Sequence, residues 1–327
     1  MPRAGDWPTI DGHMAGLRAG LVFRRVDPTA FVSVVREAEQ AGVQTAWTTQ
    51  GGLAPDALVM LAVAASQTDH IGLGTAVVPT YPRHPTALAS QAMVVSRLAG
   101  DRFRLGIGPS HRPTMEDLFG LPMSRPLQHL REYLTVLRAL LWQGSADFDG
   151  VHFKVHARLP PGVTPPRTPL LISALRTGAF RLAGELADGA ISWMCPVPYL
   201  LTAARPALQE GARAAGRPVP TLIGHVPVAL HEDRARTRAA ARQQFSTYGR
   251  LPFYAGMFRD AGYPVGEDGA LPDTLLDELV VSGSEATVLE RLQAVQASGV
   301  DELIVTPLAV ADAEAEERAL LRLLGHA

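Results

Sequence analysis

Short apolar stretches typical of β-strands alternate with longer, helix-like stretches along almost the whole chain. Alternation of this kind implies parallel pairing, with the helices as crossovers, and eight such units close most naturally into a TIM (β/α)8 barrel. A doubly wound sheet would need a glycine-rich turn after an early strand, and Arg24–Pro28, after the first one, contains no glycine. The expected strands are Gly16–Phe23, Val43–Thr49, Ile71–Pro79, Phe103–Gly108, Leu170–Ser173, Gly189–Met194, Leu222–Leu230 and Glu302–Thr306.

Three segments are longer than ordinary connections between strands and helices. They are Pro109–Ser124 after the fourth strand, Ser145–Thr168 before the fifth, and His231–Gly283 after the seventh. Long segments in a compact domain are usually functional or disordered. The first and third lie on the carboxyl side of barrel strands, where barrel active sites sit. We interpret the chain as one domain over residues 1–327, with 231–283 as an insertion that includes helix-like Arg234–Phe258.

Composition excludes several classes of partner. With 30 basic and 32 acidic residues the formal net charge is −2, so neither nucleic acid nor an anionic membrane is an expected partner. Cys195 is the single cysteine, which excludes an internal disulfide. Met1–Asp11 lacks the pattern of a signal peptide, and no apolar run is long enough to span a bilayer, so a cytoplasmic protein is expected. No metal site is predicted, because the His152 and His156 pair lies in a proline-rich loop.

Two neighbouring runs carry a family resemblance. Residues 72–85 read Gly-Leu-Gly-Thr-Ala-Val-Val-Pro-Thr-Tyr-Pro-Arg-His-Pro, and residues 98–111 read Leu-Ala-Gly-Asp-Arg-Phe-Arg-Leu-Gly-Ile-Gly-Pro-Ser-His. Together with later runs at 171–190 and 289–305, their order and spacing resemble the luciferase-like monooxygenase superfamily over roughly residues 15–310. The resemblance implies a barrel enzyme that works on a flavin or a deazaflavin. The motifs resemble its F420-dependent branch at least as well as its oxygenases.

A phosphate of such a cofactor is expected at the helix that follows the fifth strand. Thr177, Gly178 and Ala179 stand at its start, where exposed backbone N–H groups favour a phosphate. The alternative is that Gly178 is an ordinary loop glycine. At the end of the fourth strand, Gly106 and Gly108 would let a flat ring approach the backbone, and a tight-turn requirement is compatible with that role.

The resemblance also implies a support for the cofactor ring in the third strand. In this family the strand often bulges through a cis peptide bond that does not involve proline, and the matching bond here is Ala76–Val77, next to Thr75. The alternative is an ordinary trans strand.

Hydride transfer needs little more from a protein than positioning, exclusion of water and one proton donor or acceptor. Gln50 ends the second strand, where relatives often carry an acidic residue or a histidine; its amide can donate a hydrogen bond but cannot act as a base. His111 is the best titratable candidate, and an exposed loop histidine is the alternative. Arg112 could hold an anionic substrate or be a plain surface arginine.

Aromatic residues supply candidates for the substrate wall. Trp47 in the second strand and Trp193 at the end of the sixth could line the substrate or pack in the core. Tyr248 and Tyr254, in the insertion, could form a lid or have packing roles. His84, in the Arg-His-Pro element, is expected to hold the start of the helix that follows it.

We therefore predict an oxidoreductase that uses coenzyme F420 to move hydride to or from a small organic substrate. The motifs, the missing histidine at Gln50 and an arginine-rich composition, with Lys154 as the only lysine, favour this reading. A monooxygenase that uses reduced FMN from a separate reductase is the first alternative. A non-catalytic flavin-binding relative is the second. The resemblance also implies a homodimer.

Overall fold

The computed structural model describes residues 16–327, so the expectation for Met1–Asp11 lies outside the described part of the chain. Its internal contacts divide these residues into two compact units. The N-terminal unit comprises Leu21–Ala174, and the C-terminal unit comprises residues 16–20 and 175–327.

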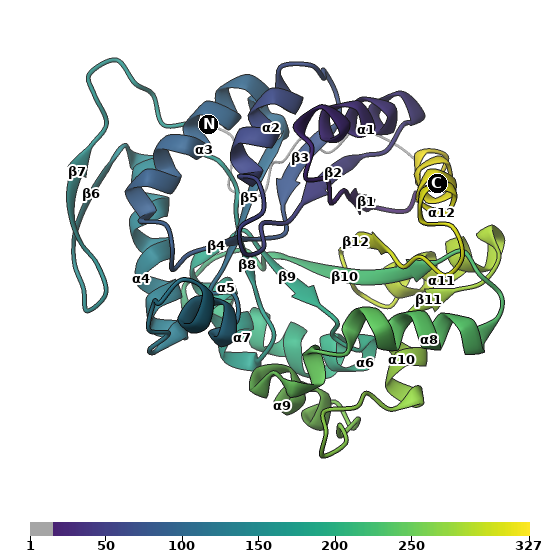
Figure 1. The fold of residues 1–327 in the computed structure, drawn as a ribbon. Coiled ribbons are helices and arrows are strands. Elements are labelled where there is room, and N and C mark those ends of the chain that lie inside the picture. Colours follow the sequence, from purple (N-terminus) through teal and green to yellow (C-terminus); the bar gives the residue numbers. More distant parts are fainter. Residues whose placement is uncertain (1–15) are drawn as a thin grey trace. The chain divides into compact units, whose positions relative to one another are not determined.

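The N-terminal unit is a parallel sheet with the order β1-β2-β3-β5-β8, in which β4 also pairs with β5. Helices α1 to α3 run beside its first strands, and an antiparallel hairpin, β6–β7, projects from the unit (Figure 1). The strands are β1 (Ala19–Val22), β2 (Thr45–Thr48), β3 (Gly72–Thr75), β4 (Val78–Pro79), β5 (Phe103–Gly108), β6 (Ser145–Asp149), β7 (Lys154–Arg158) and β8 (Leu170–Ser173). The helices are α1 (Pro28–Ala41), α2 (Ala57–Ala65), α3 (Pro85–Ala99) and α4 (Pro126–Arg138).

In the C-terminal unit, the long strand β10 pairs in parallel with β9, β11 and β12. The strands are β9 (Gly189–Trp193), β10 (Thr221–Ala229), β11 (Val281–Ser282) and β12 (Glu302–Pro307). The helices are α5 (Thr177–Leu186), α6 (Val197–Tyr199), α7 (Arg205–Ala214), α8 (Arg234–Phe245), α9 (Pro252–Asp260), α10 (Asp273–Leu279), α11 (Glu285–Ala297) and α12 (Ala313–Gly325). Eight parallel strands, each followed by at least one helix, give the α/β fold of a TIM barrel, as the sequence predicted.

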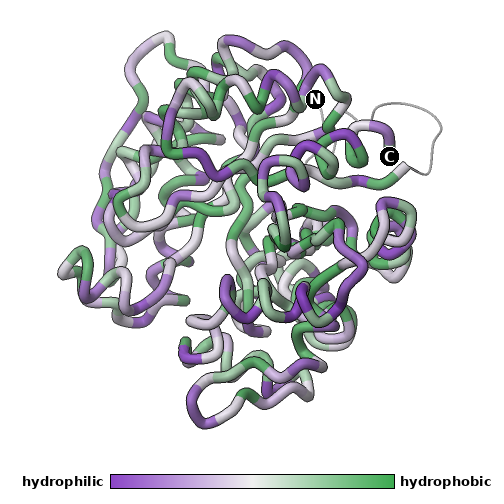
Figure 2. Tube along the Cα trace, turned by 45° about the vertical axis from the view of Figure 1, so that its right-hand side comes forward, coloured by the Kyte–Doolittle hydropathy of each residue, from purple (hydrophilic) through white to green (hydrophobic). Residues whose placement is uncertain are grey.

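Local chemistry explains where the helices begin and end. The Asp27 carboxylate accepts a hydrogen bond from Ala30 N, Pro28 occupies the first turn of α1, and Gly42 ends that helix with a positive φ of 90°. The ring of His84 accepts a hydrogen bond from Thr86 N at the start of α3, which confirms its expected structural role. Along the strands the trace is mostly hydrophobic, whereas the helices alternate between hydrophobic and hydrophilic residues (Figure 2).

Two elements are interrupted. The expected third strand, Ile71–Pro79, divides into β3 and β4 around Ala76–Val77. Helix α4 changes from α-helical to π-helical hydrogen bonding over Ala139–Gln143 and ends at Gly144. Neither interruption changes the order of the elements.

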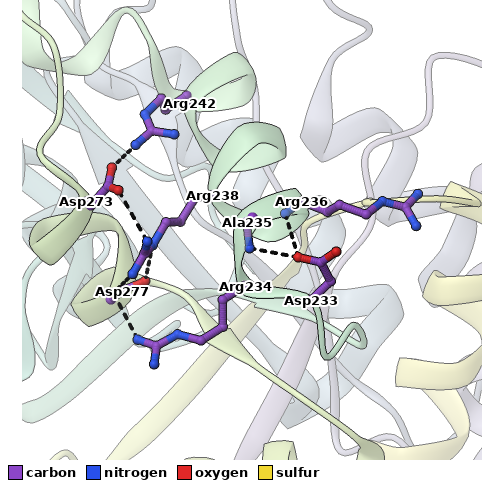
Figure 3. A network of polar contacts seen from close by, with 8 residues as sticks. All are labelled: Asp233, Arg234, Ala235, Arg236, Arg238, Arg242, Asp273 and Asp277. Carbon is purple, nitrogen blue, oxygen red and sulfur yellow. Dashed lines mark hydrogen bonds and ion pairs between the residues drawn. The ribbon is translucent and has the colours of Figure 1, made fainter.

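The insertion at 231–283 contains three helices instead of one continuous helix. Pro252 begins α9, so the helix-like stretch predicted at Arg234–Phe258 divides into α8 and α9 around a 3-10 turn at Tyr248–Arg250. Helix α8 is joined to α10 by a ladder of ion pairs between successive turns (Figure 3). The ladder consists of Arg234, Arg238 and Arg242 on α8 and Asp273 and Asp277 on α10.

No helix in residues 16–327 is both long enough and apolar enough to cross a membrane.

Candidate active site

The cis peptide bond expected between Ala76 and Val77 is present, and the ends of β2 hold it in place. Ala76 N donates to Thr48 O at 2.8 Å, and Gln50 N donates to Val77 O at 3.2 Å. The bulge between β3 and β4 is therefore bonded through its backbone on both sides of the cis bond.

Thr75 fixes the same bulge to β5. Its fully buried hydroxyl group lies 2.8 Å from both the N and the O of Gly106, donating to the carbonyl and accepting from the amide. Both capacities of the hydroxyl are used by the β5 backbone. The Thr75 side chain therefore positions the bulge.

Gln50 is oriented by a small polar network at the end of β2. Its Oε1 accepts hydrogen bonds from Ala57 N and from Arg83 Nη2, both at 3.3 Å. Arg83 in turn pairs with Asp56 at 2.5 Å. Within the described residues the Gln50 NH2 group has no acceptor, so it can donate to a ligand. Sequence reasoning treated the Arg-His-Pro element as structural and missed Arg83 as the residue that orients Gln50.

Gly108 is constrained by its neighbours in the N-terminal unit. A Cβ built there would lie 2.2 Å from Ser173 Oγ and 3.0 Å from Val77 Cγ2. Its carbonyl accepts a hydrogen bond from Thr80 N at 2.9 Å. The glycine is required for the close packing of β5 against the bulge and β8, and its φ is not positive, so close packing explains it where the sequence suggested a tight turn.

His111 follows β5 after Ser110, whose φ of 64° turns the chain out of the strand. The His111 carbonyl accepts from Met115 N at 3.0 Å, so the residue also begins the next helical turn. Burial lowers the pKa of the His111 imidazole below its usual value. At neutral pH the ring is therefore uncharged and able to accept a proton.

Arg112 is exposed and forms an ion pair with Glu116, one helical turn further on. The same Glu116 carboxylate accepts from Met123 N at 3.0 Å, which ties the pair to the rest of the loop. An anionic substrate would have to compete with Glu116 for this guanidinium group. The structure therefore favours the surface role that the sequence left open for Arg112.

Trp47 is fully buried within the N-terminal unit. Its ring lies against Gly74, where a Cβ would approach to 2.3 Å, and 4.6 Å below the guanidinium of Arg104. The predicted role in the substrate wall is therefore corrected to core packing, because the ring is enclosed by its own neighbours.

One buried histidine of the N-terminal unit was not singled out from the sequence. His129 on α4 lies flat against Tyr81, with ring centroids 3.9 Å apart, and its Nε2 is 3.1 Å from Thr80 Oγ1. Burial, together with nearby His152, lowers the pKa of His129 to about 4 despite the opposing effect of Glu132. The only sequence signal for its burial is that His129 falls on the same face of α4 as the apolar residues of that helix.

We expect His129 to make the protein less stable in mild acid. The unfolded chain binds a proton near pH 6.5 and the folded chain only near pH 4, so unfolding takes up a proton between these values. The free energy of unfolding should fall by about 3 kcal/mol as the pH drops through this window. Denaturant titrations at pH 7 and pH 4.5 measure it. In His129→Phe this part of the slope should vanish, and an unchanged slope would show that His129 is not its source.

The expected phosphate site lies in the C-terminal unit, at the start of α5. Arg176 caps this helix without a side-chain hydrogen bond, and Ala179 N donates to Arg176 O at 2.9 Å. Within the described residues the N–H groups of Thr177 and Gly178 have no acceptor. Two of the three predicted residues therefore retain a free N–H for an anion, whereas that of Ala179 is used within the helix.

Arg176 adds positive charge at the same helix start, and sequence reasoning missed it. Its guanidinium pairs with Asp260 of α9 at 2.8 Å, and Gly256 leaves room for it, since a Cβ there would lie 2.2 Å from Arg176 Nη1. The preceding carbonyl, Leu175 O, accepts from Tyr199 OH at 3.2 Å. An arginine directly before a helix that follows a barrel strand is the signal that could have identified it.

Trp193, at the end of β9, is half-buried in an aromatic cluster. Its ring centroid lies 4.4 Å from that of His225, 5.8 Å from that of Phe245 and 6.1 Å from that of Tyr248. Tyr254, 4.9 Å from Tyr248, is buried. The insertion therefore packs directly on the end of β9, and the packing role holds for Tyr254.

Within residues 16–327 no group of three or more histidine, cysteine, aspartate and glutamate side chains is placed to hold a metal ion. The groups described above are hydrogen-bond donors, the neutral imidazoles of His111 and His129, and a helix start.

Comparison with known proteins places the chain in a family. Residues 11–302 match the luciferase-like monooxygenase family, and the chain belongs to it. The protein is thus an oxidoreductase of the luciferase-like class.

Several curated relatives are similar over much of their length. An uncharacterized protein of Mycobacterium tuberculosis is 30% identical over 240 residues, which is 69% of this chain and 70% of that protein. The 5,10-methylenetetrahydromethanopterin reductase of Archaeoglobus fulgidus is 27% identical over 83% of this chain and 87% of its own. An F420-dependent glucose-6-phosphate dehydrogenase of Beutenbergia cavernae is 32% identical over 63% of this chain and 65% of its own.

Solved structures show the same fold at low identity. The coenzyme F420-dependent tetrahydromethanopterin reductase of Methanopyrus kandleri has a TM-score of 0.73 and 21% identity, covering 94% of this chain and 97% of its own. The oxygenating component of 3,6-diketocamphane monooxygenase from Pseudomonas putida, in complex with FMN, has a TM-score of 0.71 and 16% identity, covering 95% and 97%. Both confirm the barrel fold.

Proposed function

We propose that this protein is an F420-dependent oxidoreductase that transfers hydride between the deazaflavin ring and a small organic substrate. The observation that carries the choice of cofactor is the similarity, at 32% identity, to an F420-dependent dehydrogenase. The bonded bulge at Ala76–Val77 and the free donor of Gln50 support the presence of a ring-binding site but suit either cofactor.

The residues present fit such a cofactor. The Gln50 NH2 group is held by Arg83 and Ala57 with its donors free, as an acceptor on a ring edge requires. The N–H groups of Thr177 and Gly178 fit a phosphate oxygen, with Arg176 adding charge. When bound, the deazaflavin would supply the carbon that takes up or releases hydride.

His111 would move the proton that accompanies the hydride. For a substrate of the C–OH type, the neutral imidazole takes the hydroxyl proton as the C–H electron pair leaves with the hydride, so the substrate becomes a carbonyl compound. In the opposite direction the imidazolium returns that proton. The lowered pKa of His111 keeps the accepting form dominant at neutral pH.

The first test is a titration of the purified protein with oxidised F420 and, separately, with FMN, followed by quenching of fluorescence. We expect micromolar binding of F420 and much weaker binding of FMN. Selective binding of FMN would support the first alternative, a monooxygenase served by a separate reductase, and would direct the next assays to oxygen consumption. Binding of neither would indicate a relative without catalytic activity.

The assignment of the phosphate to α5 gives a separate expectation. Gly178→Asp should weaken cofactor binding about tenfold, because a carboxylate beside the free N–H groups repels the phosphate. Gly178→Asn has nearly the same shape without the charge and serves as the matched control. Equal affinities of the two variants in the same fluorescence titration would remove the phosphate from this helix.

We also propose that the protein forms a homodimer through α2 and α3. Helix α2 is apolar on all faces, and exposed Val59 and Val63 lie one turn apart, as do Val94 and Leu98 on the neighbouring α3. Val59→Glu combined with Val63→Glu should shift the mass measured by light scattering from dimer to monomer. The control is Val219→Glu, a similarly exposed valine elsewhere. A wild-type monomer would refute the proposal.

A further inference from the structure

A cavity of about 440 Å³ lies within the C-terminal unit, where the insertion meets the start of α11. Its lining includes Arg234 of α8, Asp277 of α10, and Ser284 and Arg291, the N-cap residue and a member of α11. The cavity opens just after β10 and β11, whose last residues, Ala229 and Ser282, are paired. None of the residues predicted for the cofactor or the substrate lines it. Its volume is in the range of small-molecule sites.

A minor part of the cavity lining is apolar. Ala241, Leu276 and Val280 are buried and contribute hydrocarbon surface to the lining. Most of the other lining residues are polar or charged. A ligand that fills the cavity therefore meets charged groups chiefly, with a smaller apolar contact.

The acidic side chains of the ladder have cationic partners, whereas some arginine N–H donors have no described acceptor. Arg238 and Arg234 bind the carboxylate of Asp277, and Arg238 also reaches Asp273, so both of these acids are already neutralised (Figure 3). Arg234 uses only one of its five N–H donors in the described contacts. In the ladder, therefore, both aspartates are paired, and N–H donors of Arg234 remain for another partner.

Arg291 is the exception among the arginines that line the cavity. It is half-buried, and its one described contact is a 3.4 Å hydrogen bond from Nη1 to the carbonyl of Ser282. In residues 16–327 it pairs with no carboxylate. The only unpaired acid in the lining is Glu232, which is exposed and therefore well solvated. A half-buried guanidinium without an anion needs a partner to offset its loss of water.

We infer that this cavity binds a small organic anion, with Arg291 and Arg234 holding a phosphate or carboxylate head and the apolar lining residues Ala241, Leu276 and Val280 contacting its body. The hydroxyl of Ser284, which caps α11 by accepting from Thr287 N, lies in the same wall. The ligand would bridge α8 of the insertion to α11. Binding should therefore also raise the melting temperature.

Phenyl phosphate is the probe, since it joins a dianionic head to an apolar body. Calorimetric titration should show it binding more tightly than inorganic phosphate, and benzyl alcohol, which lacks charge, should not bind. Arg291→Met keeps the length of the side chain and removes the charge; it should raise the dissociation constant at least tenfold and abolish the thermal shift. Arg322→Met on α12 removes an exposed arginine away from the cavity and should change neither.

Three results would overturn the inference. Unchanged affinity in Arg291→Met would place the phenyl phosphate elsewhere, including the start of α5. Equal binding of benzyl alcohol would show an apolar cavity without selection for charge. Tighter binding of benzylammonium would show that Glu232 dominates and that the cavity takes cations. The melting temperature of each variant without probe shows that its fold is intact, and Arg291→Gln repeats the comparison if Arg291→Met is unstable.

Discussion

Replacement of His111 by alanine is expected to lower turnover roughly 100-fold or more while leaving the affinity for the cofactor nearly unchanged. The reason is that the imidazole handles the substrate proton, whereas the described contacts of the ring support come from Thr75, Gln50 and the Ala76–Val77 bulge. In the direction that oxidises an alcohol, the wild type needs neutral His111. Because burial lowers the pKa of His111, its activity should persist somewhat below pH 6.5 and fall at more acidic pH.

The measurement is steady-state turnover against pH, combined with the fluorescence titration, for the wild type and for His111→Ala. His70→Ala removes an exposed histidine from the same unit and serves as the control. A variant that retained turnover but lost cofactor affinity would make His111 a binding residue. A variant that kept the acidic limb of the pH profile would assign that limb to another group.

Gly211→Ala is expected to destabilise the protein by about 3 kcal/mol or more, the largest effect we expect on stability from a single methyl group. Helices α5 and α7 cross with their backbones in contact at this point. A Cβ on Gly211 would lie 2.0 Å from Arg181 O, and one on Gly184 would lie 2.2 Å from Leu208 O. Backbone atoms cannot move aside as a side chain can, so the two helices would have to separate.

Denaturant unfolding of Gly211→Ala gives this difference in free energy directly. The matched control is Gly51→Ala, because a Cβ on Gly51 meets nothing within 4 Å and its φ is not positive. The control should differ from the wild type by less than about 0.5 kcal/mol. A similar small change in Gly211→Ala would mean that α5 and α7 can separate at little cost.

Patterns of apolar residues were enough to predict the fold. The spacing of apolar residues in each strand and helix follows from which of its faces is buried. Helix caps such as Asp27 and Gly42 act through residues close to them in sequence. The insertion was harder, since α8 is highly polar and is held by ion pairs with α10, which is distant in sequence. Short β11 owes its existence to its pairing with Val228 and Ala229, so no local pattern indicates it.

The candidate site was predicted only in outline. The cis bond at Ala76–Val77 came from the family resemblance and is confirmed. Arg83 and Arg176 were missed because their roles depend on partners from other elements, Gln50 and Asp260. Trp47 was misassigned because a strand residue with two equally plausible faces can be placed only when its neighbours, Gly74 and Arg104, are known.

Asp260 of helix α9 in the insertion pairs with the guanidinium of Arg176, the residue directly before α5, and Gly256 of the same helix makes space for it. The segment that differs most from a plain barrel is thus also part of the predicted anion-binding end of the cofactor site. Replacement of this insertion by that of a relative should consequently change the affinity for the cofactor. Engineering of the insertion for new substrates should keep Gly256 and Asp260 fixed.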